Sequence, residues 1–256
     1  MAETFSASVA ALYRHPVKGF TPEPLERATL SAGQAFPGDR LRAVEIGPSG
    51  FDPAVPTHIS KMRFAVLARL PEIARVRTRW DEATDTLYVS SEGAPDLTVR
   101  LGDPEDERQL EAWLTDFLGE EATAPLRLLD GGGHRFMDSP KGAVSVLNLA
   151  SVRDLSGRLG VEVDPLRFRA NVWVEGWPAW VENDWVGREM ALGGAILTVV
   201  KPIVRCVATH VDPQTGTRDI DVLSALHDLY GHHWCGLYLS VGTGGALAVG
   251  DRAELF

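Results

Sequence analysis

Cysteine is the most reactive side chain in the sequence, and the chain has two, Cys206 and Cys235. Cys206 lies in the stretch IVRCVATHVDPQTG, where it follows Arg205, ends an apolar run and precedes a turn rich in Asp, Pro, Thr and Gly. A neighbouring cation favours the thiolate form, which attacks electrophiles or binds soft metals. Cys235 lies in an apolar stretch beside aromatic residues, which predicts an ordinary buried thiol.

Cys206 has three possible roles on this reasoning: a core thiol, a nucleophile or a metal ligand. No acid–base partner for a nucleophile stands out, because the offset to His210 in a strand-to-turn segment does not fix the direction of the imidazole. A zinc site is also considered, since several ligand types occur nearby. Their spacing matches no recognised zinc pattern, and neither cysteine belongs to a C-x-x-C pair. The candidate zinc ligands are Cys206, His210, His232, His233 and Cys235.

Basic residues beside predicted turns are the second group with chemical potential. Each of them taken alone is an ordinary solvated charge. Converging in one place, they would form a pocket for an anion, because Arg and Lys give phosphate charge-assisted hydrogen bonds. Asn171 and the MDSP turn, with Asp138 and Ser139, offer further polar contacts. The four basic residues are Lys18, Arg40, Arg169 and Arg205.

The charge and composition of the chain limit its partners and its compartment. The 256 residues include 25 Lys and Arg against 35 Asp and Glu, a net charge of -10. Such a surface repels nucleic acid and anionic membranes, so an anion needs a local basic cluster. No run of 18 apolar residues predicts a membrane span, and the N-terminus does not resemble a signal peptide. Two cysteines make no disulfide framework, so we expect a cytoplasmic protein.

Short strand-like runs dominate the sequence and predict a mostly β fold with some α-helix, arranged as two barrel-like parts. Residues 76–101 indicate three short strands separated by turns. Helices are expected over 103–119 and 148–160, and a helix or helical loop over 219–231. The Gly triplet in 120–135 makes that segment the candidate linker. The tryptophan-rich stretch 171–185 is interpreted as a loop that packs on the barrel, with the wall of a substrate cleft as the alternative.

The order of several motifs resembles the MOSC family, named for the C-terminal domain of molybdenum cofactor sulfurase. The resemblance covers nearly the whole chain and is strongest to members with an added N-terminal β-barrel domain, such as the mitochondrial amidoxime-reducing component and its bacterial relatives. It implies an N-terminal β-barrel domain over 1–122 and a cofactor-binding MOSC domain over 123–256. The matching motifs are LYRHPVKGF, FPGDR, FMDSPKGAVSVLNLASVRDLSGRL, DPLRFRANVWVEG, RCVATHVDPQTG and GLYLSVGTGGALAVGDRAELF.

The resemblance also implies the roles of single residues. The family's Arg-Cys cysteine binds the molybdenum of a pterin cofactor, and its position here is Cys206. Residues at the other motif positions would hold the phosphate and pterin. They are Lys18, Arg40, Asp138, Ser139, Arg169 and Asn171, with Arg205 and Thr209 flanking the cysteine. The chain departs from the family pattern where Gly19 replaces the usual Ser, Ala170 replaces a Pro, and THISKMRFAV lacks the RQ.P pattern.

The function that this resemblance implies is that of a molybdenum-dependent oxidoreductase. We expect reduction of N-hydroxylated small molecules with electrons from a separate protein. Two alternatives remain open: a carrier or binding protein that holds the cofactor, or a sulfur on Cys206, without turnover, and a non-redox enzyme in which Cys206 is the nucleophile.

Overall fold

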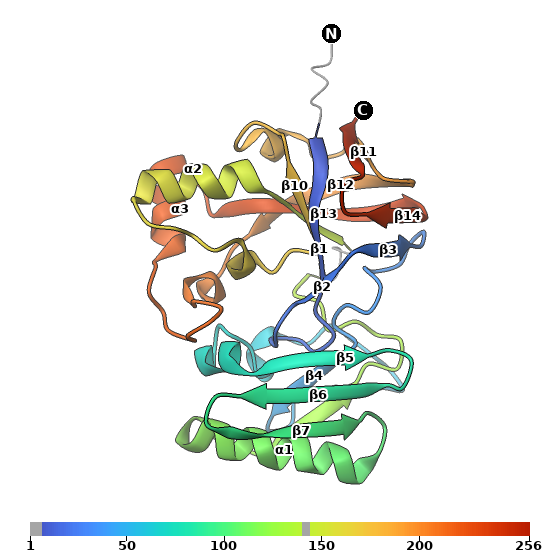
Figure 1. The fold of residues 1–256 in the computed structure, drawn as a ribbon, viewed down its shortest axis with the longest axis vertical. Coiled ribbons are helices and arrows are strands. Elements are labelled where there is room, and N and C mark those ends of the chain that lie inside the picture. The colour runs from blue at the N-terminus through green and yellow to red at the C-terminus, as the bar shows by residue number, and fades with distance from the viewer. Residues whose placement is uncertain (1–6, 140–143) are drawn as a thin grey trace.

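The computed structural model describes residues 7–139 and 144–256, and the expected mostly β fold is confirmed (Figure 1). Three α-helices accompany the strands in this described part. The strands are β1 (Ala7–Arg14), β2 (Glu23–Leu25), β3 (Arg27–Leu30), β4 (Arg42–Ile46), β5 (Arg77–Asp81), β6 (Thr86–Ser91), β7 (Ala94–Arg100), β8 (Leu126–Asp130), β9 (Val144–Asn148), β10 (Val172–Glu175), β11 (Glu189–Leu192), β12 (Ala195–Val204), β13 (Trp234–Thr243), β14 (Gly245–Ala248) and β15 (Arg252–Leu255). The helices are α1 (Pro104–Leu118), α2 (Leu149–Leu159) and α3 (Val222–Tyr230).

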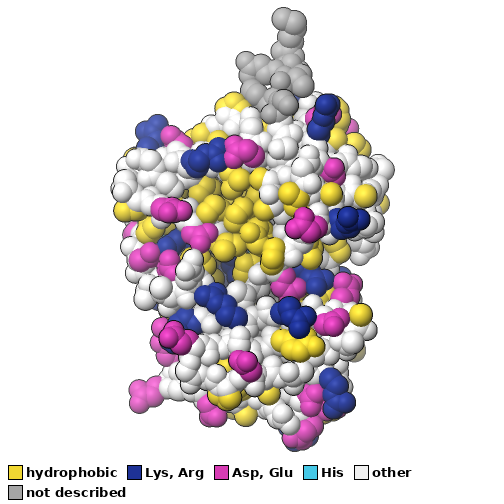
Figure 2. Space-filling view, in the orientation of Figure 1, with side chains coloured by type: hydrophobic (Ala, Val, Ile, Leu, Met, Phe, Trp, Pro, Cys, Tyr) yellow, Lys and Arg dark blue, Asp and Glu magenta, His cyan; other side chains and the backbone are white. Residues whose placement is uncertain are grey.

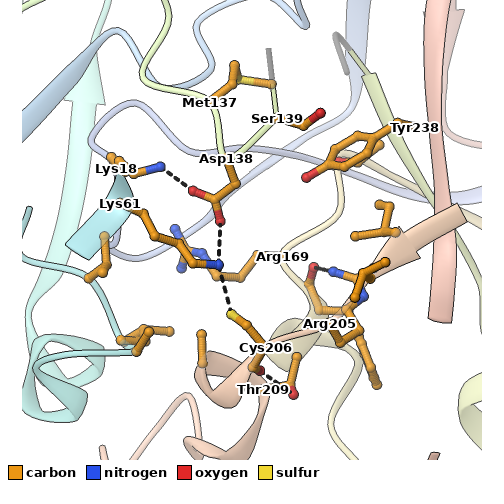
Figure 3. Close-up of a pocket in the computed structure, with 18 of the residues that line it drawn as sticks. Lys18, Lys61, Met137, Asp138, Ser139, Arg169, Arg205, Cys206, Thr209 and Tyr238 are labelled. Atoms are coloured by element: carbon orange, nitrogen blue, oxygen red, sulfur yellow. Dashed lines mark hydrogen bonds and ion pairs between the residues drawn. The ribbon is translucent and has the colours of Figure 1, made fainter. Parts of the chain in front are cut away.

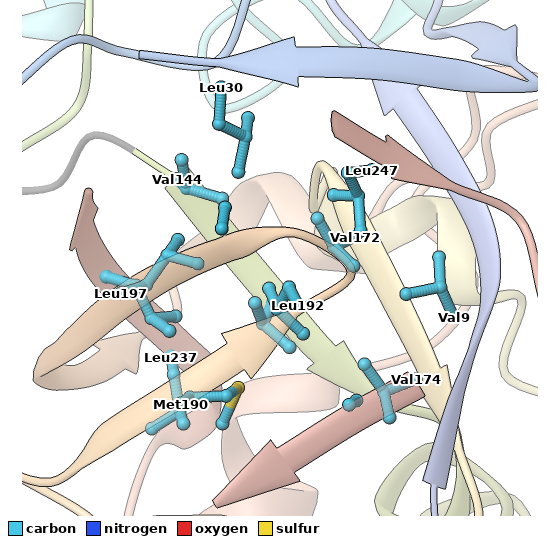
Figure 4. Close-up of a cluster of buried hydrophobic side chains, with 14 of the residues drawn as sticks. Val9, Leu30, Val144, Val172, Val174, Met190, Leu192, Leu197, Leu237 and Leu247 are labelled. Carbon is cyan, nitrogen blue, oxygen red and sulfur yellow. The ribbon is translucent and has the colours of Figure 1, made fainter. Parts of the chain in front are cut away.

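A closed seven-stranded barrel forms the upper half of the molecule in Figure 1. Its strand order is β10-β9-β13-β12-β11-β15-β1, and the pairing of β1 with β10 closes the ring. Ala7 and Val9 of β1 are alternate residues and both are buried, as expected for a strand with one face in a core, and Leu12 is buried beyond a register shift between Val9 and Ala11. They pack with Val172, Leu197 and Leu237 in the barrel interior (Figure 4).

The strand β1 has an unusual position, because it belongs to the N-terminal part of the sequence and to the C-terminal barrel. It pairs with β10 through Ser8 and Glu175, and with β15 through Ala7 and Ala253. The strand β3 likewise pairs with β14 from the far end of the chain. The N-terminal part of the sequence therefore contributes the strand β1 to the barrel, while β3 and β14 form a separate two-stranded sheet.

The lower half of the molecule consists of two small sheets and the helix α1 (Figure 1). The strand β4 pairs with β8, while β5, β6 and β7 form an antiparallel sheet over the predicted run of three strands. The helix α1 presents Leu110, Trp113 and Leu114 to a core that it shares with both sheets. The expected linker at 120–135 contains β8, so part of that segment is a paired strand.

All three expected helices are present, and polar caps explain where they begin. The side chain of Asp103 accepts the free N–H groups of Glu105 and Asp106 at the start of α1. Asn148 caps α2 in the same way, and Asp221 caps α3. Helices α2 and α3 end at Gly160 and Gly231, each in the left-handed conformation that favours glycine.

The tryptophan-rich stretch 171–185 packs on the barrel and does not form the wall of a cleft. Trp177 and Trp185 are buried in the barrel core, and their rings meet edge to face at 4.9 Å. None of the described helices is long and apolar enough to cross a membrane. On the face shown in Figure 2, acidic and basic side chains are interspersed, and hydrophobic side chains gather over the barrel half.

Candidate functional site

A cavity of about 270 Å³ lies between the two halves of the molecule (Figure 3). Its walls come from segments far apart in the sequence, from the first 20 residues to the strand β13. Eight of the nine residues predicted to bind the cofactor or metal line it. These are Lys18, Arg40, Asp138, Ser139, Arg169, Arg205, Cys206 and Thr209.

The thiol of Cys206 is half-buried at the point where β12 has just ended. A short 3-10 helix, η6 (Val207–His210), begins directly after it. Thr209 fixes this junction, because its backbone N–H and its hydroxyl both donate to the carbonyl of Cys206 at 3.0 Å. This geometry turns the chain sharply and leaves the sulfur directed into the cavity (Figure 3).

The cation in contact with the sulfur is Lys61, which was not among the residues expected at the site. Its ammonium group is 3.1 Å from the Sγ of Cys206 and 3.6 Å from a carboxylate oxygen of Asp138. Burial alone would lower the pKa of Lys61, but the charge of Asp138 and the hydrogen bond to Cys206 outweigh it and raise that pKa. Lys61 therefore stays charged. The only signal in the sequence was the departure of THISKMRFAV from the family pattern.

Lys18 and Asp138 form an ion pair on the opposite wall of the cavity (Figure 3). The Lys18 side chain is only 3% exposed, and its ammonium group also donates to the carbonyl of Phe136 at 2.8 Å. Burial lowers the pKa of Lys18, and the adjacent carboxylate offsets part of that effect. For Asp138, burial favours the neutral acid, but the charges of Lys18 and Lys61 prevail and hold its pKa well below the usual range.

Gly19 occupies the position where the family pattern has Ser, and the backbone explains this departure. Its φ of +90° is disfavoured for residues that carry a Cβ. A Cβ added here would lie 2.3 Å from the carbonyl oxygen of Ala65. Glycine therefore lets the chain after Lys18 pass close to the 65–66 backbone, and a side chain is excluded.

A buried His15–Asp39 pair fixes the turn that carries Arg40. One carboxylate oxygen of Asp39 accepts the backbone N–H of His15 at 2.7 Å and contacts its Nδ1 at 3.0 Å. The other pairs with the Arg40 guanidinium. The backbone N–H of Arg40 donates to the carbonyl of His15. Two distant turns, one with Lys18 and one with Arg40, are thus joined as a unit.

Arg169 has the clearest unmet hydrogen-bonding capacity in the cavity. It is in the left-handed conformation with φ 50° and ends the 3-10 helix η4 (Pro165–Phe168). Its Nη2 is buried and has no hydrogen-bond partner among the described residues. Burial, followed by the charge of Arg40, lowers the pKa of Arg169 to about 10. Leaving a buried charged donor unpaired is costly, so an anion in the cavity would be stabilising there.

Arg205 is turned toward the protein backbone rather than toward the sulfur. Its guanidinium donates to the carbonyls of Phe168 and Cys235. Its role in the described contacts is to hold η4 against the start of β13. Gly236 makes this approach possible, because a Cβ there would lie 3.1 Å from the Arg205 Nη2 and 2.5 Å from the carbonyl of Val146.

Asn171 is the one predicted site residue that does not line the cavity. It is fully buried behind Ser145, a lining residue, and accepts hydrogen bonds from the Ser145 N–H and hydroxyl. Its amide donates to the carbonyl of Tyr13 at 3.1 Å. Asn171 therefore joins β9, β10 and β1 beneath the site.

The cavity concentrates positive charge in an acidic chain. Its lining contains seven Lys and Arg side chains and one carboxylate, that of Asp138. Arg167 is compensated by Asp219 and Asp212, and Arg40 by Asp39. The remaining cations still outnumber Asp138, so the cavity attracts anions. The seven are Lys18, Arg40, Lys61, Arg167, Arg169, Lys201 and Arg205.

The alternative chemistries for Cys206 find less support. His210 contacts Asp221 at 3.2 Å and accepts from the N–H of Leu223, so its imidazole is engaged with the start of α3. No group of three or more His, Cys, Asp and Glu side chains in the described residues is arranged to hold a metal ion. Cys235 is buried in the core between α2 and α3, and burial raises the pKa of its thiol to about 12.

Two family patterns together match almost the entire chain. The MOSC domain matches residues 133–254, and the MOSC N-terminal beta barrel domain matches residues 6–124. The chain belongs to the MOSC family and carries its N-terminal module.

Similar proteins include mitochondrial amidoxime reducing component 2 of Bos taurus, 33% identical over 122 residues that make up 42% of this chain and 35% of that protein. Molybdenum cofactor sulfurase of Caenorhabditis elegans is 33% identical over 119 residues, 45% of this chain and 16% of that protein. The matched stretch thus spans about a third of the first relative and a sixth of the second. The YUAD protein of Bacillus subtilis aligns over 100% of this chain and 98% of its own, with 14% identity and a TM-score of 0.48.

Proposed function

We propose that this protein binds a molybdenum cofactor in the cavity and is an oxidoreductase that depends on it. The observation that carries the proposal is that one cavity contains a thiol together with more cations than carboxylates. The chain as a whole has a net charge of -10. Family membership and the names of the similar proteins support the identity of the metal.

The residues present fit such a group. Cys206 offers a sulfur ligand to the metal, and the cations suit the anionic phosphate of a pterin cofactor. The unpartnered Nη2 of Arg169 supplies a buried donor that the protein itself does not satisfy. When bound, the cofactor supplies a redox-active metal that exchanges an oxygen atom with a substrate.

The protein's own residues would position and stabilise this group. Lys18 and Arg40 are held rigidly by Phe136, Asp138 and Asp39, so they bind an anion with little loss of side-chain freedom. Lys61 holds a proton at Nζ beside the sulfur and balances negative charge there. Tyr238 and Lys201 complete the wall beside Arg205.

The finer reaction that we propose is the reduction of N-hydroxylated small molecules, with electrons delivered by a separate protein. It rests on the similarity to proteins named amidoxime reducing components. An amidoxime carries an N–O bond, and its reduction to an amidine and water consumes two electrons and two protons.

The deciding experiment is the molybdenum and pterin content of the protein purified from a host that makes the cofactor. Wild type should carry about one of each per chain, and Cys206→Ala should lose the metal. Cys235→Ala is the matched control, since that thiol is buried away from the cavity and its loss should leave the metal in place. A wild-type protein without metal or pterin, even with cofactor supplied, would refute the proposal.

A cofactor or sulfur carrier is the second candidate, and the half-buried position of Cys206 favours it, because a partner can reach the sulfur. One of the similar proteins is named molybdenum cofactor sulfurase. Loaded protein that transfers its cofactor to a cofactor-free acceptor enzyme, but reduces no N-hydroxylated compound, would identify the carrier.

A further inference from the structure

Two apolar side chains lie unusually exposed beside Cys206. Val204 is 67% exposed and Trp234 is 39% exposed, although strand residues of these types are ordinarily buried. Val204 also lines the cavity, two residues before Cys206. Val204 and Trp234 are directly opposite one another where β12 and β13 pair. Side chains of opposed residues in an antiparallel pair lie on the same face, so the two form one apolar surface.

Trp234 is the outer member of a stack of three rings. The rings of Tyr230 and His232 lie 6.0 Å apart at 19°, and those of His232 and Trp234 lie 5.1 Å apart at 13°. The stack is anchored from below, because the hydroxyl of Tyr230 donates to Asp154 at 2.6 Å. The same carboxylate accepts the indole N–H of Trp180. The outer ring is thus held in place before any ligand arrives.

The middle ring of the stack is uncharged. The backbone N–H of Trp234 donates to the Nδ1 of His232 at 3.1 Å, so Nδ1 carries no proton, and burial lowers the pKa of this imidazole. The Nε2 of His232 lies 3.3 Å from the side-chain nitrogen, Nδ2, of Asn183. The rigid indole face can stack with a planar group, and the nearby basic cavity repels a cation, so a neutral planar group fits this surface best.

We propose that Val204 and Trp234 form an aryl-binding subsite at the mouth of the cavity. This inference rests on the proposed function and names its substrate class: N-hydroxylated compounds whose N–O group is joined to an extended planar aromatic system. Trp234 lies opposite Val204 on the neighbouring strand, and Cys206 is two residues after Val204. Trp234 and Cys206 are therefore roughly 10 Å apart. One ring does not reach so far, whereas two linked rings do.

The test compares two amidoximes with the cofactor-loaded protein and a chemical reductant as the electron source. Acetamidoxime carries only a methyl group, and 4-phenylbenzamidoxime carries two linked rings. Trp234→Ser should lower kcat/KM for 4-phenylbenzamidoxime roughly fivefold to tenfold, the value of an aromatic contact, and that for acetamidoxime less than twofold. Val204→Ser should act in the same direction. Val186→Ser, at another exposed valine that lies outside the cavity lining, should change neither value.

A binding measurement separates this subsite from the proposed reaction. The amides 4-phenylbenzamide and acetamide contain no N–O bond, so calorimetry reports their binding without turnover. Wild type should bind 4-phenylbenzamide, and Trp234→Ser should weaken that binding by a similar factor. If the amide binding depends on Trp234 but no amidoxime is reduced, the proposed function fails and the subsite stands. If both amidoximes are reduced and Trp234→Ser lowers their kcat/KM equally, the subsite is refuted. If Trp234→Ser lowers the activity only when a protein supplies the electrons, the subsite is also refuted, and this surface is a docking site for the electron donor.

Discussion

At the scale of single residues, the site depends on charges that the protein buries and then compensates. Lys18, Arg40 and Lys61 each have a carboxylate partner, Asp39 or Asp138, that keeps part of the positive charge balanced before a ligand binds. Replacing such a carboxylate would leave uncompensated buried cations, which is more costly than losing a surface ion pair.

His15 makes the first prediction at this scale, a dependence of stability on pH. Burial lowers its pKa from 6.5 to about 3, helped by the charges of Arg40 and Arg169 and opposed by Asp39. Between these pH values only the unfolded chain binds the proton, so stability is complete above about 6.5 and falls as the pH drops toward 3. The loss is about 1.4 kcal/mol per pH unit where only the unfolded state is protonated.

The measurement is the melting temperature of wild type and His15→Asn between pH 6.5 and 5, where carboxylates remain ionised. Asparagine keeps a donor near Asp39 but does not titrate, so its melting temperature should fall less over this range. His58→Asn, at an exposed histidine, should behave as wild type. Equal slopes for wild type and His15→Asn would contradict the assignment.

The residues that the sequence predicted, and those that it missed, differ in how they reach the cavity. Cys206, Lys18 and Arg40 lie in turns with recognisable motifs, so type and spacing were informative. Lys61 has no such motif, and only long-range folding brings its ammonium group to the sulfur. Asn171 lies close to Arg169 and directly before β10, yet its side chain is buried behind Ser145, because proximity in sequence does not fix the direction of a side chain.

At the scale of elements, local signals predicted the helices well because caps are short-range. Asp103, Asn148 and Asp221 each begin a helix within the ranges expected. The pairing of strands was not predictable, since β1 and β15 are partners from opposite ends of the chain. Likewise β8 pairs with β4 across about eighty residues, which concealed it within an apparent linker.

Gly19 gives the prediction that belongs to this scale. Gly19→Ser restores the residue of the family pattern, yet it should destabilise the protein by about 1–3 kcal/mol, because the positive φ and the contact with the Ala65 carbonyl both oppose a side chain. Chemical unfolding measures the change. Gly157→Ser is the matched control, since Gly157 lies in α2 with open space around it. Unchanged or higher stability of Gly19→Ser would contradict the account.

At the scale of the whole molecule, we propose that the sequence divides into two modules, 1–122 and 123–256, although the barrel contains strands from both. The fragment 123–256 lacks β1, so β10 and β15 would become open edges and apolar interior residues would be exposed. We expect this fragment alone to aggregate, and co-expression with 1–122 to restore a soluble complex. Size-exclusion chromatography and circular dichroism give the readout. A monomeric fragment 123–256 with a cooperative thermal transition would contradict this expectation.

The pairing of Ala7 with Ala253 has a consequence for biosynthesis. A ribosome adds about 5–20 residues per second, so β1 emerges roughly 12 to 50 seconds before its partner β15 exists. During that interval its apolar face has no native barrel to enter. We expect the nascent chain to need cover for this strand during that interval, either from the lower half that is made early or from a chaperone.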